Sequence, residues 1–146
     1  MIRPARLDER KDLIALQRRA SLMWDEDRAA LLAHPDVIDL PTDQIAEGHV
    51  FVWMEAGEVM GFAVVLPRED GDAELDGLFV EPEGWGRGIG RALVDHAAEK
   101  ARGRGSDLLN VVSNKRALGF YRKCGFETLG EVATRFSNGV AMVRGL

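Results

Sequence analysis

A junction between a strand, a glycine-rich loop and a helix is the feature that most constrains the fold of this chain. The apolar run Leu78-Phe79-Val80 leads into a turn with glycine at every second position from Gly84 to Gly90, and helical spacing follows directly. Glycine allows positive φ and lets a ligand come close to the main chain. A helix N-terminus adds unpaired N–H groups and partial positive charge. The sequence therefore predicts a site for a phosphorylated cofactor here.

Two common phosphate-binding loops do not fit this junction. A P-loop requires a Gly-Lys pair, and the chain contains none. The dinucleotide motif G-x-G-x-x-G also fails, since Ile89 stands three residues after Gly86 and Arg91 three residues after Gly88. Neither a dinucleotide nor a nucleoside triphosphate is therefore expected.

The composition is that of an ordinary globular chain. Its 146 residues, 46% hydrophobic and 29% charged, are expected to form a single domain over residues 1–146. No apolar run reaches membrane-spanning length, so no membrane partner is expected. One cysteine argues against disulfides and for the cytoplasm, and the scattered histidines make no metal motif. A sequence pI near 5.2 argues against nucleic acid.

The charge is distributed unevenly along the chain. Residues 1–86 hold 8 basic and 19 acidic side chains, whereas residues 87–123 hold 9 basic and 3 acidic ones. The basic segment begins at the glycine loop and would attract an anionic cofactor. The acidic part would favour a cationic acceptor such as an amine, although chance sorting of charged helix faces explains it equally well.

Periodicity and turn residues predict the element order β-α-α-β-β-β-α-β-α-β-β. The expected elements are a strand over 2–7, a helix capped by Asp8, a short helix over 24–33, one helical turn after Thr42, strands over 49–54 and 59–66 joined at Ala56-Gly57, a strand over 73–80, a helix over 88–102, a strand over 108–112, a helix over 114–123, and a hairpin over 126–144 that turns at Ser137-Asn138-Gly139.

Two blocks resemble one known family. The loop Trp85-Gly86-Arg87-Gly88-Ile89-Gly90 is similar to the [QR]-x-x-G-x-[GA] loop of the GNAT family of acyl-CoA-dependent N-acetyltransferases, with Trp85 where the family usually has Gln or Arg. The segment from Asn114 to Phe126 resembles the family's N-x-x-A-x-x-F-Y-x-x-x-G-F segment. The resemblance implies an α/β (α+β) fold, with a mixed, mostly antiparallel sheet of about seven strands and helices on both faces.

The resemblance also implies a cofactor, acetyl-CoA, and roles for particular residues. The main chain of Leu78, Phe79 and Val80 would pair with the pantetheine arm as an added strand would. The pyrophosphate would meet the backbone of Arg87, Gly88, Ile89, Gly90 and Arg91, with the two arginines adding charge. Asn114 would contact the cofactor, or cap the helix that follows it. Tyr121 would act as the general acid toward the thiolate, with amphipathic packing as the alternative.

The general base is not fixed by either block. Glu74 and Asp76 share one face of the strand that precedes the loop, because strand side chains alternate. Either carboxylate could take a proton from the attacking amine, and the alternative is that both are simply solvated. His34, His49 and His96 are weaker candidates.

These observations predict an N-acetyltransferase. It would transfer an acetyl group from acetyl-CoA to a primary amine of a small molecule or peptide, by direct attack in a ternary complex. The alternative is a non-catalytic acyl-CoA-binding or sensor module that has kept the cofactor site. A homodimer through the C-terminal strands is also open.

Overall fold

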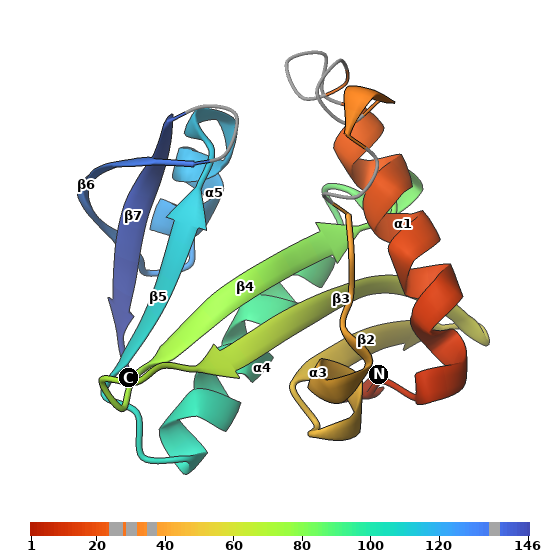
Figure 1. Ribbon diagram of the computed structural model, residues 1–146, viewed down its shortest axis with the longest axis horizontal. Helices are drawn as coiled ribbons and strands as arrows, with labels where there is room; N and C mark the ends of the chain where they lie inside the picture. The colour runs from red at the N-terminus through yellow and green to blue at the C-terminus, as the bar shows by residue number, and fades with distance from the viewer. Residues whose placement is uncertain (24–27, 29–31, 35–37, 135–137) are drawn as a thin grey trace. The chain divides into compact units, whose positions relative to one another are not determined.

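The computed structural model describes residues 1–23, 28, 32–34, 38–134 and 138–146. Within these residues seven strands form one sheet in the order β1-β2-β3-β4-β5-β7-β6 (Figure 1). The pairs β1–β2, β2–β3, β5–β7 and β6–β7 are antiparallel, and β4–β5 is parallel. The sheet is therefore the mixed, mostly antiparallel one that was predicted.

The helices and strands follow the predicted order in the described part of the chain. Their bounds are β1 (Ile2–Pro4), the 3₁₀ helix η1 (Leu7–Glu9), α1 (Arg10–Leu22), α3 (Thr42–Ala46), β2 (Val50–Glu55), β3 (Glu58–Pro67), β4 (Ala73–Val80), η3 (Pro82–Gly84), α4 (Ile89–Gly103), β5 (Leu108–Ser113), η4 (Lys115–Ala117), α5 (Leu118–Lys123), β6 (Glu127–Ala133) and β7 (Asn138–Gly145). The helix predicted over 24–33 lies mostly outside the described residues.

The chain divides into two compact units. The first comprises Met1–Val64 and Gly77–Leu93, and the second comprises Val65–Asp76 and Val94–Leu146. Strands β3 and β4 and helix α4 each contribute residues to both units. That residues 1–146 fold as a single domain stays a prediction.

Strand β3 is the best-buried element of the first unit. Residues 60–64 are all buried, and since alternate side chains point to opposite faces, both faces of the strand are covered. Helix α1 buries its apolar positions Leu13, Leu16 and Ala20. Figure 1 shows α1 in front of the β2–β3 hairpin. The start of α4 packs against β3 at Gly61, where Ile89 and Leu93 approach the strand.

The turn between β2 and β3 confirms the hairpin predicted at Ala56-Gly57. Glu55 pairs with Glu58, which leaves a two-residue loop. Ala56 and Gly57 have φ values of 50° and 80°. Positive φ at both positions is the geometry of a type I′ turn, whose twist matches that of the flanking strands.

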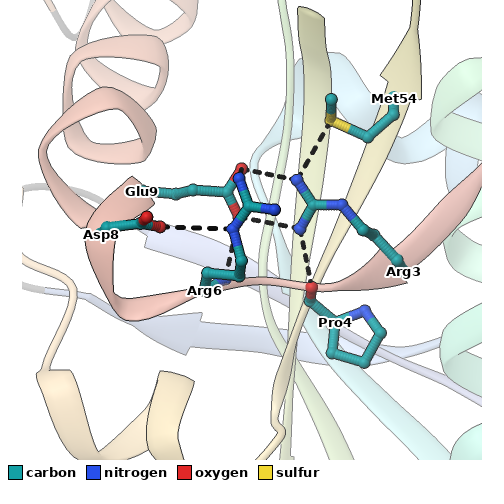
Figure 2. Close-up of polar contacts among 6 residues, drawn as sticks. All are labelled: Arg3, Pro4, Arg6, Asp8, Glu9 and Met54. Carbon is teal, nitrogen blue, oxygen red and sulfur yellow. Dashed lines mark hydrogen bonds and ion pairs between the residues drawn. The ribbon is translucent and has the colours of Figure 1, made fainter. Parts of the chain in front are cut away.

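The start of α1 corrects one prediction. Asp8 does not cap the helix: it lies inside η1, exposed, with its carboxylate 3.4 Å from Arg6 Nε. Glu9 takes the capping role, since its carboxylate accepts the backbone N–H of Arg6 at 2.8 Å. Glu9 is also bound in bidentate fashion by Arg3, at 2.9 and 2.7 Å (Figure 2). The ion pair with Arg3, rather than a local capping preference, therefore determines that Glu9 and not Asp8 takes this role.

The Arg3–Glu9 pair ties β1 to the start of α1 and should contribute to stability. The hydrogen bond from Arg3, and then the backbone N–H of Arg6, lower the pKa of Glu9 against the opposing effect of burial. The Glu9 side chain is only 11% exposed. We expect Glu9→Gln to lower the free energy of unfolding by about 2 kcal/mol at pH 7, measured by urea denaturation.

The pH dependence has a definite sign. Because the pKa of Glu9 is lowered in the folded protein, the stabilisation is present above the ordinary glutamate pKa and is lost as pH falls through the folded value. The difference between wild type and Glu9→Gln should therefore shrink in acid. Asp8→Asn, at an exposed neighbour, is the matched control and should change little. A difference independent of pH would contradict this account.

The second unit is organised around β7, which pairs with β5 on one side and β6 on the other. The predicted turn is wrong at Asn138 and Gly139, which belong to β7 and pair with Ala133 and Val132, and its first residue, Ser137, lies outside the described residues. A Cβ at Gly139 would lie 2.8 Å from Val112 Cγ1 on β5. Close packing between strands, rather than turn geometry, therefore requires glycine here.

Replacement of Gly139 should therefore destabilise the second unit. We expect Gly139→Ala to lower the free energy of unfolding by about 1–3 kcal/mol, because the added methyl group overpacks against Val112. Gly145→Ala is the control on the same strand, since a Cβ there meets no atom within 4 Å. Equal unfolding midpoints for the two variants in urea would contradict the role given to Gly139.

Candidate active site

The glycine loop of the first unit has the conformation that its sequence predicts. Gly86 and Gly88 have φ values of 79° and 82°, in the left-handed region that favours glycine. At the start of α4, the first backbone N–H that has a hydrogen-bond acceptor is that of Ala92, which donates to the Gly88 carbonyl at 3.0 Å. In the described part of the chain, no acceptor is found for the amides of Gly88, Ile89, Gly90 and Arg91. These N–H groups and the helix dipole make this end of α4 attractive to an anion.

Close packing of α4 on β3 sets the position of these amides. A Cβ at Gly61 would lie 3.0 Å from the Phe79 carbonyl oxygen, 3.2 Å from Leu93 Cδ1 and 3.3 Å from Ile89 Cγ2. Ile89 is 2% exposed, so its side chain belongs to the core and only its amide is open to a ligand. The missing side chain at Gly61 thus allows the helix to start directly against the strand.

The two arginines of the loop differ in their surroundings. Arg87 forms an ion pair with Glu55 at the end of β2. Arg91 is exposed and has no ion-pair partner among the residues that the structure describes. Arg91 is therefore the more available guanidinium for an anionic ligand. No local pattern indicated the Arg87–Glu55 pair, because the two residues are 32 positions apart.

The main chain of β4 presents only some of its groups to a ligand. The amide of Glu81 donates to the Met60 carbonyl on β3 at 2.8 Å, so by alternation Phe79 also turns its main chain toward β3. The main-chain groups of Leu78 and Val80 point to the opposite edge. The register with β5 covers only Ala73 and Glu74. Of the three residues predicted to hold the pantetheine arm, Leu78 and Val80 therefore have suitably directed groups, and Phe79 does not.

The candidate bases lie in the second unit, on β4. Glu74 pairs with Asn110 across the β4–β5 ladder, and Asp76 follows on the same face of the strand. Loss of solvent to the surrounding protein raises the pKa of Asp76, although the residue keeps an exposed side. Neither carboxylate has an ion-pair partner among the described residues. A raised pKa makes Asp76 a better proton acceptor than an ordinary, fully solvated aspartate.

Tyr121 lies on α5 in the second unit with its ring buried, since the residue is 8% exposed. Its ring makes edge-on contacts with Phe120 and Phe126, at centroid distances of 5.1 and 5.4 Å. Desolvation, with a smaller contribution from Cys124, raises the pKa of Tyr121 to about 12. Within the described residues its hydroxyl has no hydrogen-bond partner. Tyr121 is therefore a protonated donor at neutral pH, and its ring also packs in the core.

Asn114 caps the helix that follows it, as the structural alternative predicted. It has extended backbone, and its Oδ1 accepts the Ala117 amide at 2.9 Å. Its amide NH₂ group takes no part in this cap. A cofactor contact by Asn114 stays a prediction, and it would have to use that NH₂ group or the main chain.

The described part of the chain contains no cluster of three His, Cys, Asp or Glu residues that could hold a metal ion. Among the same residues, no helix combines the length and apolarity needed to cross a membrane.

Comparison with known proteins identifies the family. The model of the acetyltransferase (GNAT) family matches residues 16–126. The chain is 32% identical over 130 residues to a protein named peptidyl-lysine N-acetyltransferase YjaB of Salmonella typhimurium, covering 88% of this chain and 84% of that protein. Identity to YjaB of Escherichia coli K12 is 30% over 132 residues, covering 88% and 83%. The PaiA N-acetyltransferase of Thermoplasma acidophilum, crystallised with coenzyme A, superposes with a TM-score of 0.82 at 16% identity, covering 100% of this chain and 98% of that one.

The chain therefore belongs to the GNAT acetyltransferase family, as its two sequence blocks predicted. It is an acyltransferase, and the cofactor of its family is acetyl-CoA. The likeness to the PaiA structure confirms the predicted fold.

The geometry of the loop leads to a prediction about coenzyme A. We expect Gly88→Ala to weaken coenzyme A binding at least tenfold, because left-handed backbone disfavours alanine and the shift displaces the amides that follow. Calorimetric titration measures the affinity.

Gly48→Ala is a closely matched control. Gly48 lies in the same unit and has φ of 80°, and a Cβ at Gly48, like one at Gly88, would meet no atom within 4 Å. Both variants should lose about 1 kcal/mol of stability, but only Gly88→Ala should lose affinity. Equal affinities of the two variants for coenzyme A would exclude the loop from cofactor binding.

Proposed function

We propose that this enzyme transfers an acetyl group from acetyl-CoA to a primary amine, by direct attack of the amine on the thioester in a ternary complex. The observation that carries the proposal is the arrangement in the first unit, where open amides at the start of α4 follow directly on the open edge of β4. The named activity of the YjaB relatives, peptidyl-lysine acetylation, favours a lysine side chain as acceptor, with small-molecule amines as the second class.

The cofactor would be held mainly by main-chain groups. Its pyrophosphate would accept hydrogen bonds from the amides at the start of α4, with Arg91 adding charge. Its pantetheine arm would pair with the carbonyl of Leu78 and the amide of Val80. In a parallel pair of strands, one residue donates its N–H to one such carbonyl and accepts a hydrogen bond from one such amide with its own carbonyl. Asn114 is a further candidate contact.

The attacking amine must first be neutral. A lysine ammonium has a pKa near ~10.4, so deprotonation at pH 7 costs about 5 kcal/mol. Asp76, or Glu74 on the same face, would accept this proton directly or through water. The raised pKa of Asp76 narrows the pKa difference from the ammonium and favours Asp76 over a fully solvated aspartate.

The bond changes are simple. The amine nitrogen attacks the thioester carbon, the oxygen gains negative charge, and an N–H of the β4 edge would stabilise that charge. Collapse breaks the C–S bond and releases the thiolate, while the attacking nitrogen loses its second proton to water and becomes the amide nitrogen. Because the pKa of Tyr121 is about 12 and that of a thiol is near ~8.5, we infer that Tyr121 stabilises the thiolate by hydrogen bonding rather than by giving up its proton completely.

Tyr121→Phe tests this role, because it removes the hydroxyl and keeps the ring that packs against Phe120 and Phe126. We expect kcat to fall at least tenfold, with the KM for acetyl-CoA and the melting temperature nearly unchanged. Thiol release from acetyl-CoA is the assay, with a lysine peptide and with a small polyamine as acceptors. A kcat equal to that of wild type with both acceptors would remove the hydroxyl from the mechanism.

The pH profile tests the base. A base must be deprotonated, so activity should fall as pH drops through the pKa of Asp76, and Asp76→Asn should lower activity and remove that limb. Glu74→Gln is the matched variant on the same face, and the same loss there would assign the base to Glu74. Tight binding of acetyl-CoA without transfer to any amine would instead support the sensor module. The cytoplasmic location and the homodimer remain predictions.

A further inference from the structure

Trp85 is the position at which the loop departs from the usual sequence of its family, and its side chain makes an unexpected contact. The indole Nε1 donates a hydrogen bond to the main-chain carbonyl of Val80, at 2.9 Å. The side chain is therefore folded back onto the end of β4, and the residue remains 40% exposed. Nothing in the sequence indicated this contact.

The alternation of main-chain groups along β4 shows which edge of the strand the indole contacts. Since the Glu81 amide bonds to Met60 on β3, the Val80 carbonyl lies on the opposite edge, which Leu78 shares. The indole N–H takes the place that an N–H from an added strand would occupy. The pairing edge thus ends at Val80, and its next open groups are the Val80 amide and the Leu78 carbonyl.

The same contact helps to fix the loop. Side-chain contacts hold the segment between β4 and α4, among them Arg19 with Glu81, Trp85 with Val80, and Arg87 with Glu55. The Arg87–Glu55 pair is exposed on both sides and contributes little, whereas Glu81 is only 12% exposed beside Arg19. The neutral hydrogen bond of the indole is less sensitive to salt and joins the loop directly to the strand.

The indole contacts one part of the proposed cofactor site, and its residue adjoins the other part along the chain. Trp85 precedes the open amides of Gly88 to Arg91 in the chain, and its Nε1 contacts the strand edge at Val80. A ligand that extends from those amides to Leu78 would come close to Val80 and therefore to the indole bonded to it. We propose that Trp85 is a positioning residue for the acetyl-CoA cofactor, one that closes the β4 edge at Val80 and lines the path of the pantetheine arm. This inference rests on the proposed function.

Trp85→Phe removes the N–H donor and keeps an aromatic ring. We expect the KM for acetyl-CoA to rise roughly threefold to tenfold, as for the loss of one hydrogen bond, while kcat stays within about twofold. A residue that only stabilised the fold would lower the melting temperature without this split. An unchanged KM for acetyl-CoA in Trp85→Phe would overturn the proposal.

Fluorescence supplies an independent readout that does not depend on the folding of that variant. The chain has three tryptophans, Trp24, Trp53 and Trp85. Replacing Trp24 and Trp53 by Phe leaves Trp85 as the only emitter. Coenzyme A should then reduce acrylamide quenching, because the arm covers the exposed ring. Quenching that coenzyme A does not alter, although it binds, would overturn the proposal.

Failure of the two proposals can be told apart with wild-type protein. If calorimetry detects no coenzyme A binding to wild type, the proposed function itself fails. If wild type binds and the Trp85 readouts are silent, only the inference about Trp85 fails.

Discussion

The contact of α4 with β3 at Gly61 is the constraint on which the site depends. Because residue 61 has no side chain, Ile89 and Leu93 pack directly over the strand, and the Phe79 carbonyl also lies within 3.0 Å of the Cβ position. The helix therefore starts immediately beside the end of β4. Open helix amides and an open strand edge become neighbours in the first unit, and a ligand with a phosphate head and an amide-bearing arm matches both.

Local sequence predicted this junction well and long-range contacts poorly. The glycine spacing, the strand before it and the helix after it have local causes, namely backbone freedom and apolar periodicity. The Trp85–Val80 hydrogen bond and the Arg87–Glu55 pair depend on how strands and loops meet in space, which no local pattern encodes. The sequence could name the residues of the loop, but not which of their side chains are already engaged.

The two corrected elements have the same explanation. Asp8 has the side chain of a good cap, yet Glu9 is selected because Arg3 provides a buried partner for it. Asn138-Gly139 has the composition of a tight turn, yet Gly139 is needed within β7 because Val112 occupies the space of a side chain. In both cases tertiary packing overrides a local preference. The desolvation that raises the pKa of Asp76 likewise depends on the packing around β4 and cannot be read from strand alternation.

The central claim is that coenzyme A binds along the β4 edge and on the amides at the start of α4. Titration of isotope-labelled protein with coenzyme A, followed by amide NMR shifts, tests it most directly. We expect saturable shifts centred on Val80, Gly88, Ile89, Gly90 and Arg91, with little change at the Ala56-Gly57 turn. Saturable shifts confined to other parts of the chain, with these amides unmoved, would contradict it.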